Sequence, residues 1–187
     1  MSDKRKMEIR ISGLGGQGVI LAGQIIGKAA CLFEGLYSTM IQSFGPEARG
    51  GACSAQVVVS PEPIMYPYIK NPDILVAMSQ EAYRLYANKV KSGGVILYES
   101  ELVEISGVPE GVKCYGIPAT RLAEKIRNKV LLNIVMLGFF SAFCDTINHD
   151  AIKKAIASSV PKGTEGFNLN AFNEGFEEGL KLKAERK

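Results

Sequence analysis

The chain has 187 residues and a net charge of +3, and 47% of its residues are hydrophobic and 22% charged. This balance is close to the average of soluble globular proteins. It excludes a disordered chain, which lacks the apolar surface that offsets ordering entropy. At roughly 150 residues per domain, the length predicts a single domain over residues 1–187.

The distribution of charge and hydrophobicity argues against nucleic-acid and membrane partners. Basic residues cluster only near the termini, at residues 4–6 and 181–187, whereas nucleic-acid binders gather them along one face. The longest apolar run, residues 130–143, is shorter than the ~20 residues that span a bilayer. Residues 1–10 are mostly charged and do not resemble a signal peptide. We therefore expect a cytoplasmic protein.

Hydrophobic periodicity predicts strands that alternate with helices. Strands are expected at residues 7–12, 37–42, 52–60, 73–78, 95–98 and 112–117. Helices are expected from residue 19 to about 35, at 80–90, 119–128, 129–144 and 149–159, and from about residue 170. This alternation predicts an α/β fold, a single-domain sandwich around a mostly parallel or mixed sheet. Residues 163–170 are the best candidate for a boundary, but we expect them to join a docking C-terminal helix to the same domain.

The four cysteines are spaced too far apart for a zinc site or an iron–sulfur cluster. Small or apolar residues surround Cys31, Cys53 and Cys144, which predicts buried thiols that pack as small hydrophobic groups. The single histidine, His149, cannot form a multi-histidine metal site. The sequence therefore predicts no catalytic residue and no metal ligand.

A glycine-rich segment, Gly13–Gly18, lies between the first expected strand and the first expected helix. Its spacing is Gly-x-Gly-x-x-Gly, in which glycines accept positive φ and let a ligand approach the free N–H groups of the helix. We expect positive φ at Gly15, so that Gly15→Val would strain the loop. A phosphate, a pyrophosphate or a carboxylate fits this place. The alternative is that the glycines only allow close helix–strand packing.

The same segment lacks two features of known nucleotide sites. A dinucleotide fingerprint needs an acidic residue at the end of the second strand, where this chain has Gln42 and Ser43. A P-loop needs Gly-Lys-Ser or Gly-Lys-Thr after the glycines, and position 17 is Gln. The sequence therefore argues against a nicotinamide dinucleotide and against phosphoryl transfer.

A second glycine-containing segment, residues 43–51, follows the second expected strand with the sequence Ser-Phe-Gly-Pro-Glu-Ala-Arg-Gly-Gly. Loops after the first and second strands of a doubly wound sheet lie at its carboxyl edge, where ligands bind. Two glycines follow Arg49 and leave its guanidinium free to form a bidentate pair with a carboxylate or phosphate. The alternative is a local ion pair with Glu47, worth about 0–1 kcal/mol.

Together, the two glycine motifs resemble those of the gamma subunit of 2-oxoacid:ferredoxin oxidoreductases. The likeness continues through Val57–Pro61, Pro72–Ala77, Gly93–Ile96, Ile117–Thr120 and Asn133–Gly138, and so covers nearly the whole chain. The Glu-Ala-Arg-Gly-Gly form of the second motif is most similar to the 2-oxoglutarate enzymes, with the pyruvate and 2-oxoisovalerate types close to it.

The resemblance implies a gamma-type three-layer α/β sandwich in a multi-subunit enzyme. Such enzymes oxidatively decarboxylate a 2-oxoacid to its acyl-CoA and reduce ferredoxin. The resemblance places thiamine diphosphate and Mg²⁺ on alpha and beta subunits, and iron–sulfur clusters on a delta or ferredoxin-like partner. This chain is then expected to bind no cofactor tightly, to be inactive alone, and to contribute to assembly and to the handling of coenzyme A.

In that role, the ligand-binding residues are expected on the two glycine loops. They are Gly13, Gly15, Gly16, Gln17, Gly18, Ser43, Arg49, Gly50 and Gly51. Gln17 and Ser43 would donate hydrogen bonds, and Arg49 would hold an anionic group or contact another subunit. The apolar, proline-containing run Pro63–Ile69 is expected to meet a partner, unless it packs on its own domain. Two other functions stay open: a free-standing nucleotide- or cofactor-binding oxidoreductase, and a purely architectural interaction domain.

Overall fold

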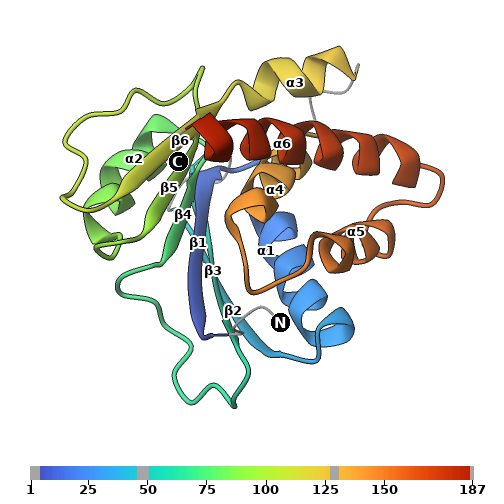
Figure 1. Cartoon of the computed structure of the whole chain (residues 1–187), viewed down its shortest axis with the longest axis horizontal. Coiled ribbons are helices and arrows are strands. Elements are labelled where there is room, and N and C mark those ends of the chain that lie inside the picture. The colour runs from blue at the N-terminus through green and yellow to red at the C-terminus, as the bar shows by residue number, and fades with distance from the viewer. Residues whose placement is uncertain (1–4, 46–50, 127–130, 186–187) are drawn as a thin grey trace.

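A six-stranded sheet forms the centre of the computed structural model, which describes residues 5–45, 51–126 and 131–185 (Figure 1). The strands are β1 (Met7–Leu14), β2 (Tyr37–Phe44), β3 (Ala52–Ser60), β4 (Ile74–Ala77), β5 (Val95–Glu99) and β6 (Lys113–Ile117). Their order across the sheet is β2-β3-β1-β4-β5-β6. Every strand except β3 runs in the same direction, because β3 is antiparallel to both β1 and β2. The prediction of a mostly parallel or mixed sheet is confirmed.

Helices cover both faces of this sheet. They are α1 (Val19–Lys28), α2 (Gln80–Tyr86), α3 (Ala119–Lys125), α4 (Leu132–Phe143), α5 (His149–Ala157) and α6 (Glu165–Glu185). The helices α1, α4, α5 and α6 share one apolar cluster with the sheet, and α2 packs on the opposite face around a second cluster (Figure 1). The result is the predicted three-layer α/β sandwich. None of the helices in the described residues is both long and apolar enough to cross a membrane.

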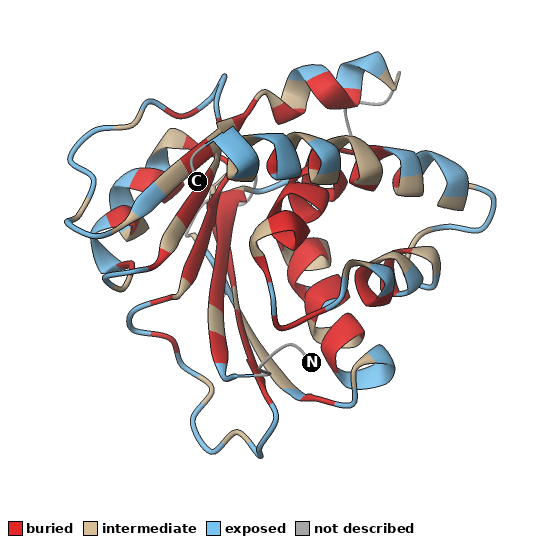
Figure 2. Cartoon of the chain, viewed as in Figure 1, coloured by how far each residue is buried: buried red, intermediate tan, exposed pale blue. Residues whose placement is uncertain are grey.

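The most deeply buried elements are those whose residues are apolar on every side. Each residue of β4 is buried between β1 and β5, as a central parallel strand requires (Figure 2). Nearly all residues of α4 are buried, including Phe139 and Phe140. A helix without a polar face belongs inside a protein. The apolar run at residues 132–143 is therefore a core helix.

The C-terminal helix begins earlier than expected, at Glu165 instead of about residue 170. A turn starts it: the Thr164 hydroxyl donates to the Pro161 carbonyl at 2.7 Å, and the main-chain N–H of Asn168 donates to the Thr164 carbonyl at 3.1 Å. Residues 165–167 are half-buried or exposed, so they carry little hydrophobic periodicity. Most of the segment 163–170 is thus helical.

The cysteine prediction is confirmed at two positions and wrong at one. Cys53 and Cys144 are buried, but Cys31 is exposed. After α1 the chain forms a π-helical turn, Ala29–Phe33, whose different residue spacing directs Cys31 outward. Burial raises the pKa of Cys53, and it raises the pKa of Cys144 to about 11, so both thiols are neutral near pH 7.

Candidate functional site

The first glycine loop joins the end of β1 to the start of α1. Gly16 and Gly18 have left-handed backbones, with φ of 94° and 73°, whereas Gly15 is not among the glycines of the described chain with positive φ. The positive φ that was expected at Gly15 is therefore found at Gly16 and Gly18 instead, and a side chain would strain the backbone at those two residues. Gly13 serves close packing, since a Cβ there would meet the side chains of Gln17, Met78 and Val19.

Gln17 holds the loop in this shape through both ends of its side-chain amide. Its Oε1 accepts a hydrogen bond from the Leu14 N–H at 2.6 Å, and its Nε2 donates to the carbonyl of Met78 at 2.9 Å. Met78 follows β4 directly, so Gln17 ties the loop to the neighbouring parallel strand. The amide that was expected to donate to a ligand forms an internal brace.

Asn133, near the start of α4, packs against Gly18 of the first glycine loop. Its side chain is 4% exposed, and its Nδ2 donates to the Gly18 carbonyl at 3.3 Å. A Cβ on Gly18 would collide with the Asn133 side chain, so this position requires glycine for its contact as well as for its backbone. In the sequence, Asn133 stands out only as the first residue of the family-like segment Asn133–Gly138. Its polar side chain in an otherwise apolar helix is the signal for this role.

The second glycine loop reaches the same edge of the sheet. It connects β2 to β3 as a hairpin, and the Gly45 N–H donates to the Ala52 carbonyl at 2.6 Å. Gly51 meets the first loop, because its carbonyl accepts from the Gly15 N–H at 2.9 Å. Ser43 lies at the exposed end of β2. The residues 46–50, including Arg49 and Gly50, lie outside the described residues.

This edge offers main-chain N–H groups and a positive helix end. The first turn of α1 contains no acidic residue, and Gly18 at its N-cap provides no side-chain cap. The first amides of a helix have no carbonyl partner within it, and the helix dipole adds roughly half a positive charge there. The described residues contain no cluster of His, Cys, Asp or Glu able to hold a metal. The chemistry available here is binding of an anion or another hydrogen-bond acceptor.

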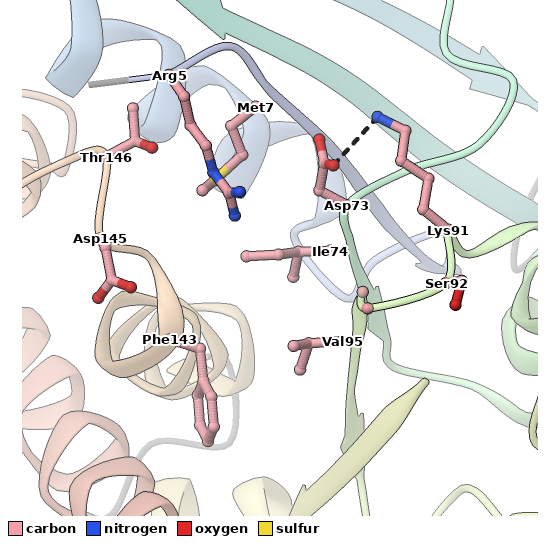
Figure 3. Close-up of a pocket in the computed structure, with 12 residues that line it drawn as sticks. Arg5, Met7, Asp73, Ile74, Lys91, Ser92, Val95, Phe143, Asp145 and Thr146 are labelled. Carbon is pink, nitrogen blue, oxygen red and sulfur yellow. Dashed lines mark hydrogen bonds and ion pairs between the residues drawn. The ribbon is translucent and has the colours of Figure 1, made fainter. Parts of the chain in front are cut away.

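A cavity of about 550 Å³ lies at the opposite, amino edge of the sheet (Figure 3). Met7, Ile74 and Val95, at the starts of β1, β4 and β5, line it together with Phe143 at the end of α4. Arg5, Asp73, Lys91 and Asp145 surround it with charges of both signs. The sequence does not predict this cavity, because the cavity forms between strand starts and a helix end that are distant in the chain.

Lys91 links two acidic groups beside this cavity. Its Nζ is 2.9 Å from an oxygen of Glu8 and 3.1 Å from one of Asp73. Burial would raise the pKa of Glu8, but its hydrogen bonds with Lys91 and Lys6 outweigh burial and lower it. Burial opposes protonation of Lys91 as well, yet its two acidic partners raise its pKa. The network therefore favours the charged forms of Glu8 and Lys91.

Comparisons with known proteins cover almost the whole chain. Residues 8–178 match the family described as pyruvate ferredoxin/flavodoxin oxidoreductase. The chain is 48% identical over 181 residues to the 2-oxoglutarate synthase subunit KorC of Methanocaldococcus jannaschii, a match that covers 96% of this chain and 97% of the relative.

Two solved structures resemble the fold. One is the gamma subunit of a keto/oxoacid ferredoxin oxidoreductase from Geobacter sulfurreducens, with a TM-score of 0.83 and 36% identity, covering 94% of this chain and 99% of that chain. The other is a 2-oxoglutarate:ferredoxin oxidoreductase from Magnetococcus marinus with 2-oxoglutarate, coenzyme A and succinyl-CoA bound. Its TM-score is 0.86 at 29% identity, and the match covers 96% of this chain and 32% of that chain.

Proposed function

The chain belongs to the pyruvate ferredoxin/flavodoxin oxidoreductase family as a gamma-type subunit. We propose that the complex containing this subunit oxidises 2-oxoglutarate. We also propose that the two glycine loops of this subunit contact coenzyme A. Three relatives named as 2-oxoglutarate synthase subunit KorC are 45–48% identical to it and a fourth is 33% identical. Two named as ketoisovalerate oxidoreductase subunit VorA are 34–37% identical, and two named as pyruvate synthase subunit PorC are 31% identical. The higher identity of the three KorC relatives supports 2-oxoglutarate as the substrate of the complex.

The hydrogen bond between Gly15 and Gly51 carries the coenzyme A proposal. It joins the two loops beside the uncapped start of α1 and so gathers main-chain groups from both at one edge. Coenzyme A carries phosphates, which suit the positive end of a helix, and amides, which pair with main-chain groups. Gln17 and Asn133 act as positioning residues that keep this backbone open, while Ser43 and Arg49 provide side-chain contacts.

In this proposal the redox chemistry takes place on other subunits. The alpha and beta subunits hold thiamine diphosphate and Mg²⁺, a delta or ferredoxin-like subunit holds iron–sulfur clusters, and ferredoxin receives the electrons. This chain binds coenzyme A and presents it to the acyl group that forms on its partners. Its own residues move no electrons.

A surface for these partners is the loop that contains Pro63–Ile69. Ile69 anchors it, because this residue is buried and its carbonyl accepts from Arg10 Nη2 at 2.9 Å. The tip projects outward, with Met65 91% exposed and Tyr66 and Tyr68 more than half exposed. Apolar and aromatic side chains held away from their own core are typical of protein interfaces. We propose that this tip docks on a partner subunit.

Steady-state kinetics of the reconstituted complex test the coenzyme A contact. Arg49→Ala should raise the KM for coenzyme A by about tenfold or more, as loss of a charge-assisted hydrogen bond of 1.5–3 kcal/mol predicts, with little change in the KM for 2-oxoglutarate. Arg84→Ala, on the exposed side of α2, is the matched control and should change neither.

The other outcomes separate the alternative functions. A complex that fails to assemble with Arg49→Ala but binds coenzyme A normally where it forms would make Arg49 an interface residue. Unchanged kinetics and assembly would refute both roles. Tight binding of NAD or FAD by the isolated chain, or its activity with a nicotinamide cofactor, would instead favour a free-standing oxidoreductase.

A further inference from the structure

The outer strand β2 has an unpaired edge that no other strand of the described residues covers. It pairs with β3 on one side, over eight consecutive residue pairs without a bulge. Its sequence, Tyr-Ser-Thr-Met-Ile-Gln-Ser-Phe, contains neither a charged residue nor a proline. Natural proteins protect exposed edges with lysines, prolines, bulges or covering segments. The sequence and register of β2 contain none of the first three.

Apolar side chains stand at both ends of this edge. Phe44, at the end of β2, is 65% exposed, and Tyr37, at its start, is half exposed. The π-helical turn before β2 packs against the strand and adds Leu32, which is 66% exposed, and Phe33. The unpaired backbone and the exposed apolar side chains are independent features of one surface. A strand that pairs with β2 would form hydrogen bonds with this backbone and cover part of these side chains.

We propose that β2 pairs antiparallel with β2 of a second copy of this chain, so that two six-stranded sheets join across a twofold axis. A second copy of β2 suits this edge because β2 contains no charged residue. An uncharged strand meets itself without placing like charges opposite one another, which would be destabilising. A twofold interface also requires a surface complementary to itself, and the alternating N–H and C=O groups of a strand edge have this property.

The geometry of antiparallel pairing limits the register. Residues directly opposite each other have side chains on the same face of the sheet. Two identical strands related by a twofold axis therefore place one residue opposite its own copy. The greatest overlap of β2 that this allows is seven residues, with Met40 or Ile41, both aliphatic and half-buried, opposite its own copy. The two glycine-loop edges then lie at opposite ends of the shared strand pair, roughly 27 Å apart for eight residues at ~3.4 Å each.

The expected dimer is weak. A strand edge about 27 Å long and about 10 Å thick offers roughly 270 Å² per copy, and the flanking apolar side chains extend it. Stable interfaces bury about 800 Å² per partner. We therefore expect the dimer to dissociate into single chains at micromolar protein concentrations. This inference does not depend on the coenzyme A proposal, because it concerns a different edge of the sheet.

Sedimentation velocity and hydrogen–deuterium exchange of the full chain test this inference together. Mass should rise toward that of a dimer with concentration, and amide protection should rise with it at residues 37–44. Gln42→Lys introduces a charge at an exposed edge position and should weaken the dimer at least tenfold, with an unchanged melting temperature. Asn88→Lys, exposed after α2, is the matched control and should leave the dimer intact.

A second variant guards against loss of folding. If Gln42→Lys lowers the melting temperature, Phe44→Ser, at an exposed side chain, should weaken the dimer in its place. A chain that stays monomeric at all concentrations overturns the inference. So does a dimer that forms without protection of residues 37–44, which would use another surface. Protection of β2 that appears only after alpha and beta subunits are added would assign the edge to a strand of a different subunit, and would also overturn it.

Discussion

Gly16 and Gly18 both have left-handed backbones, but only Gly18 faces a neighbouring side chain. A Cβ on Gly16 would meet no atom within 4 Å, whereas a Cβ on Gly18 would collide with Asn133. The two glycines therefore allow the backbone requirement to be separated from the packing requirement within one loop.

Alanine at these two positions should destabilise the protein to different degrees. Gly16→Ala should lower the free energy of unfolding by about 1 kcal/mol, which is the cost of a left-handed backbone at a residue with a Cβ. Gly18→Ala should lower it by about 2–4 kcal/mol, because overpacking adds to the same backbone cost. Urea denaturation measures both. In an Asn133→Ala background the difference between the two variants should shrink, and a difference that persists would contradict the contact.

The cysteines should differ sharply in reactivity. Cys31 is exposed, whereas burial raises the pKa of Cys144 to about 11 and also raises that of Cys53. Because the thiolate is the reactive species, a thiol-specific reagent should modify Cys31 first at pH 8, and Cys31→Ser should remove this fast phase. Denaturant should expose all four thiols. Fast modification of Cys144 in the native protein would contradict its burial.

Helices α4 and α6 cross at glycines on both partners. A Cβ on Gly138 would overlap the backbone of Phe172, and a Cβ on Gly175 would overlap the backbone of Val135. Glycine is otherwise unfavourable within a helix by roughly 0.5–1 kcal/mol relative to alanine. Close approach of the two backbones therefore explains glycine at these positions.

The same substitution should have opposite effects at two sites in α6. Gly175→Ala should lower the free energy of unfolding by more than about 2 kcal/mol, because the added methyl group forces the helices apart. Gly166→Ala is the control. No atom lies within 4 Å of a Cβ there, so helix propensity should raise stability by about 0.5–1 kcal/mol. Thermal unfolding measures both, and stabilisation by Gly175→Ala would refute the close crossing.

The position of the second glycine loop was predictable, but its topology was not. Its place after the second strand predicts the carboxyl edge of the sheet, and Gly51 does meet the first loop there. The loop is nevertheless a hairpin between β2 and β3, because β3 runs antiparallel to the rest of the sheet. The direction of β3 depends on how it pairs with β1. The hydrophobic periodicity of residues 52–60 indicates a strand but does not indicate its direction.

At the scale of the whole molecule, the ion network around Lys91 ties the amino edge of the sheet together. Glu8 belongs to β1, Asp73 precedes β4, and Lys91 precedes β5. The lowered pKa of Glu8 means that its contribution to stability is present above its ordinary value of 4.5 and is lost as pH falls through the lowered pKa. The raised pKa of Lys91 means the reverse: its contribution is present below 10.5 and is lost as pH rises through the raised pKa.

Replacing Glu8 should therefore remove part of the acid sensitivity. Glu8→Gln should lower the free energy of unfolding by about 1 kcal/mol at pH 7, a modest value because Lys91 is partly exposed. The difference from the native chain should shrink as pH falls from 4.5 through the lowered pKa of Glu8. Denaturation from pH 3 to 7 measures it, with the exposed Glu110→Gln as control. A deficit that stays constant across this range would show that the network does not titrate.

The sequence by itself determined the elements of the sandwich, the two glycine loops and the family resemblance. Periodicity reports burial, and glycines at fixed spacing report backbone needs, both of which are local properties. The sequence placed the start of the last helix too late and placed Cys31 in the core. Both errors occur at positions where the local pattern of residues is weak.

Only the tertiary structure decided what holds the loops in place. Gln17 reaches Met78, and Gly18 rests on Asn133, which is 115 residues away in the chain. The antiparallel β3, the glycine crossing of α4 and α6, and the cavity at the amino edge arise in the same way. The physical reason is that such contacts join segments whose proximity depends on the packing of the entire chain, which no local pattern of residues records.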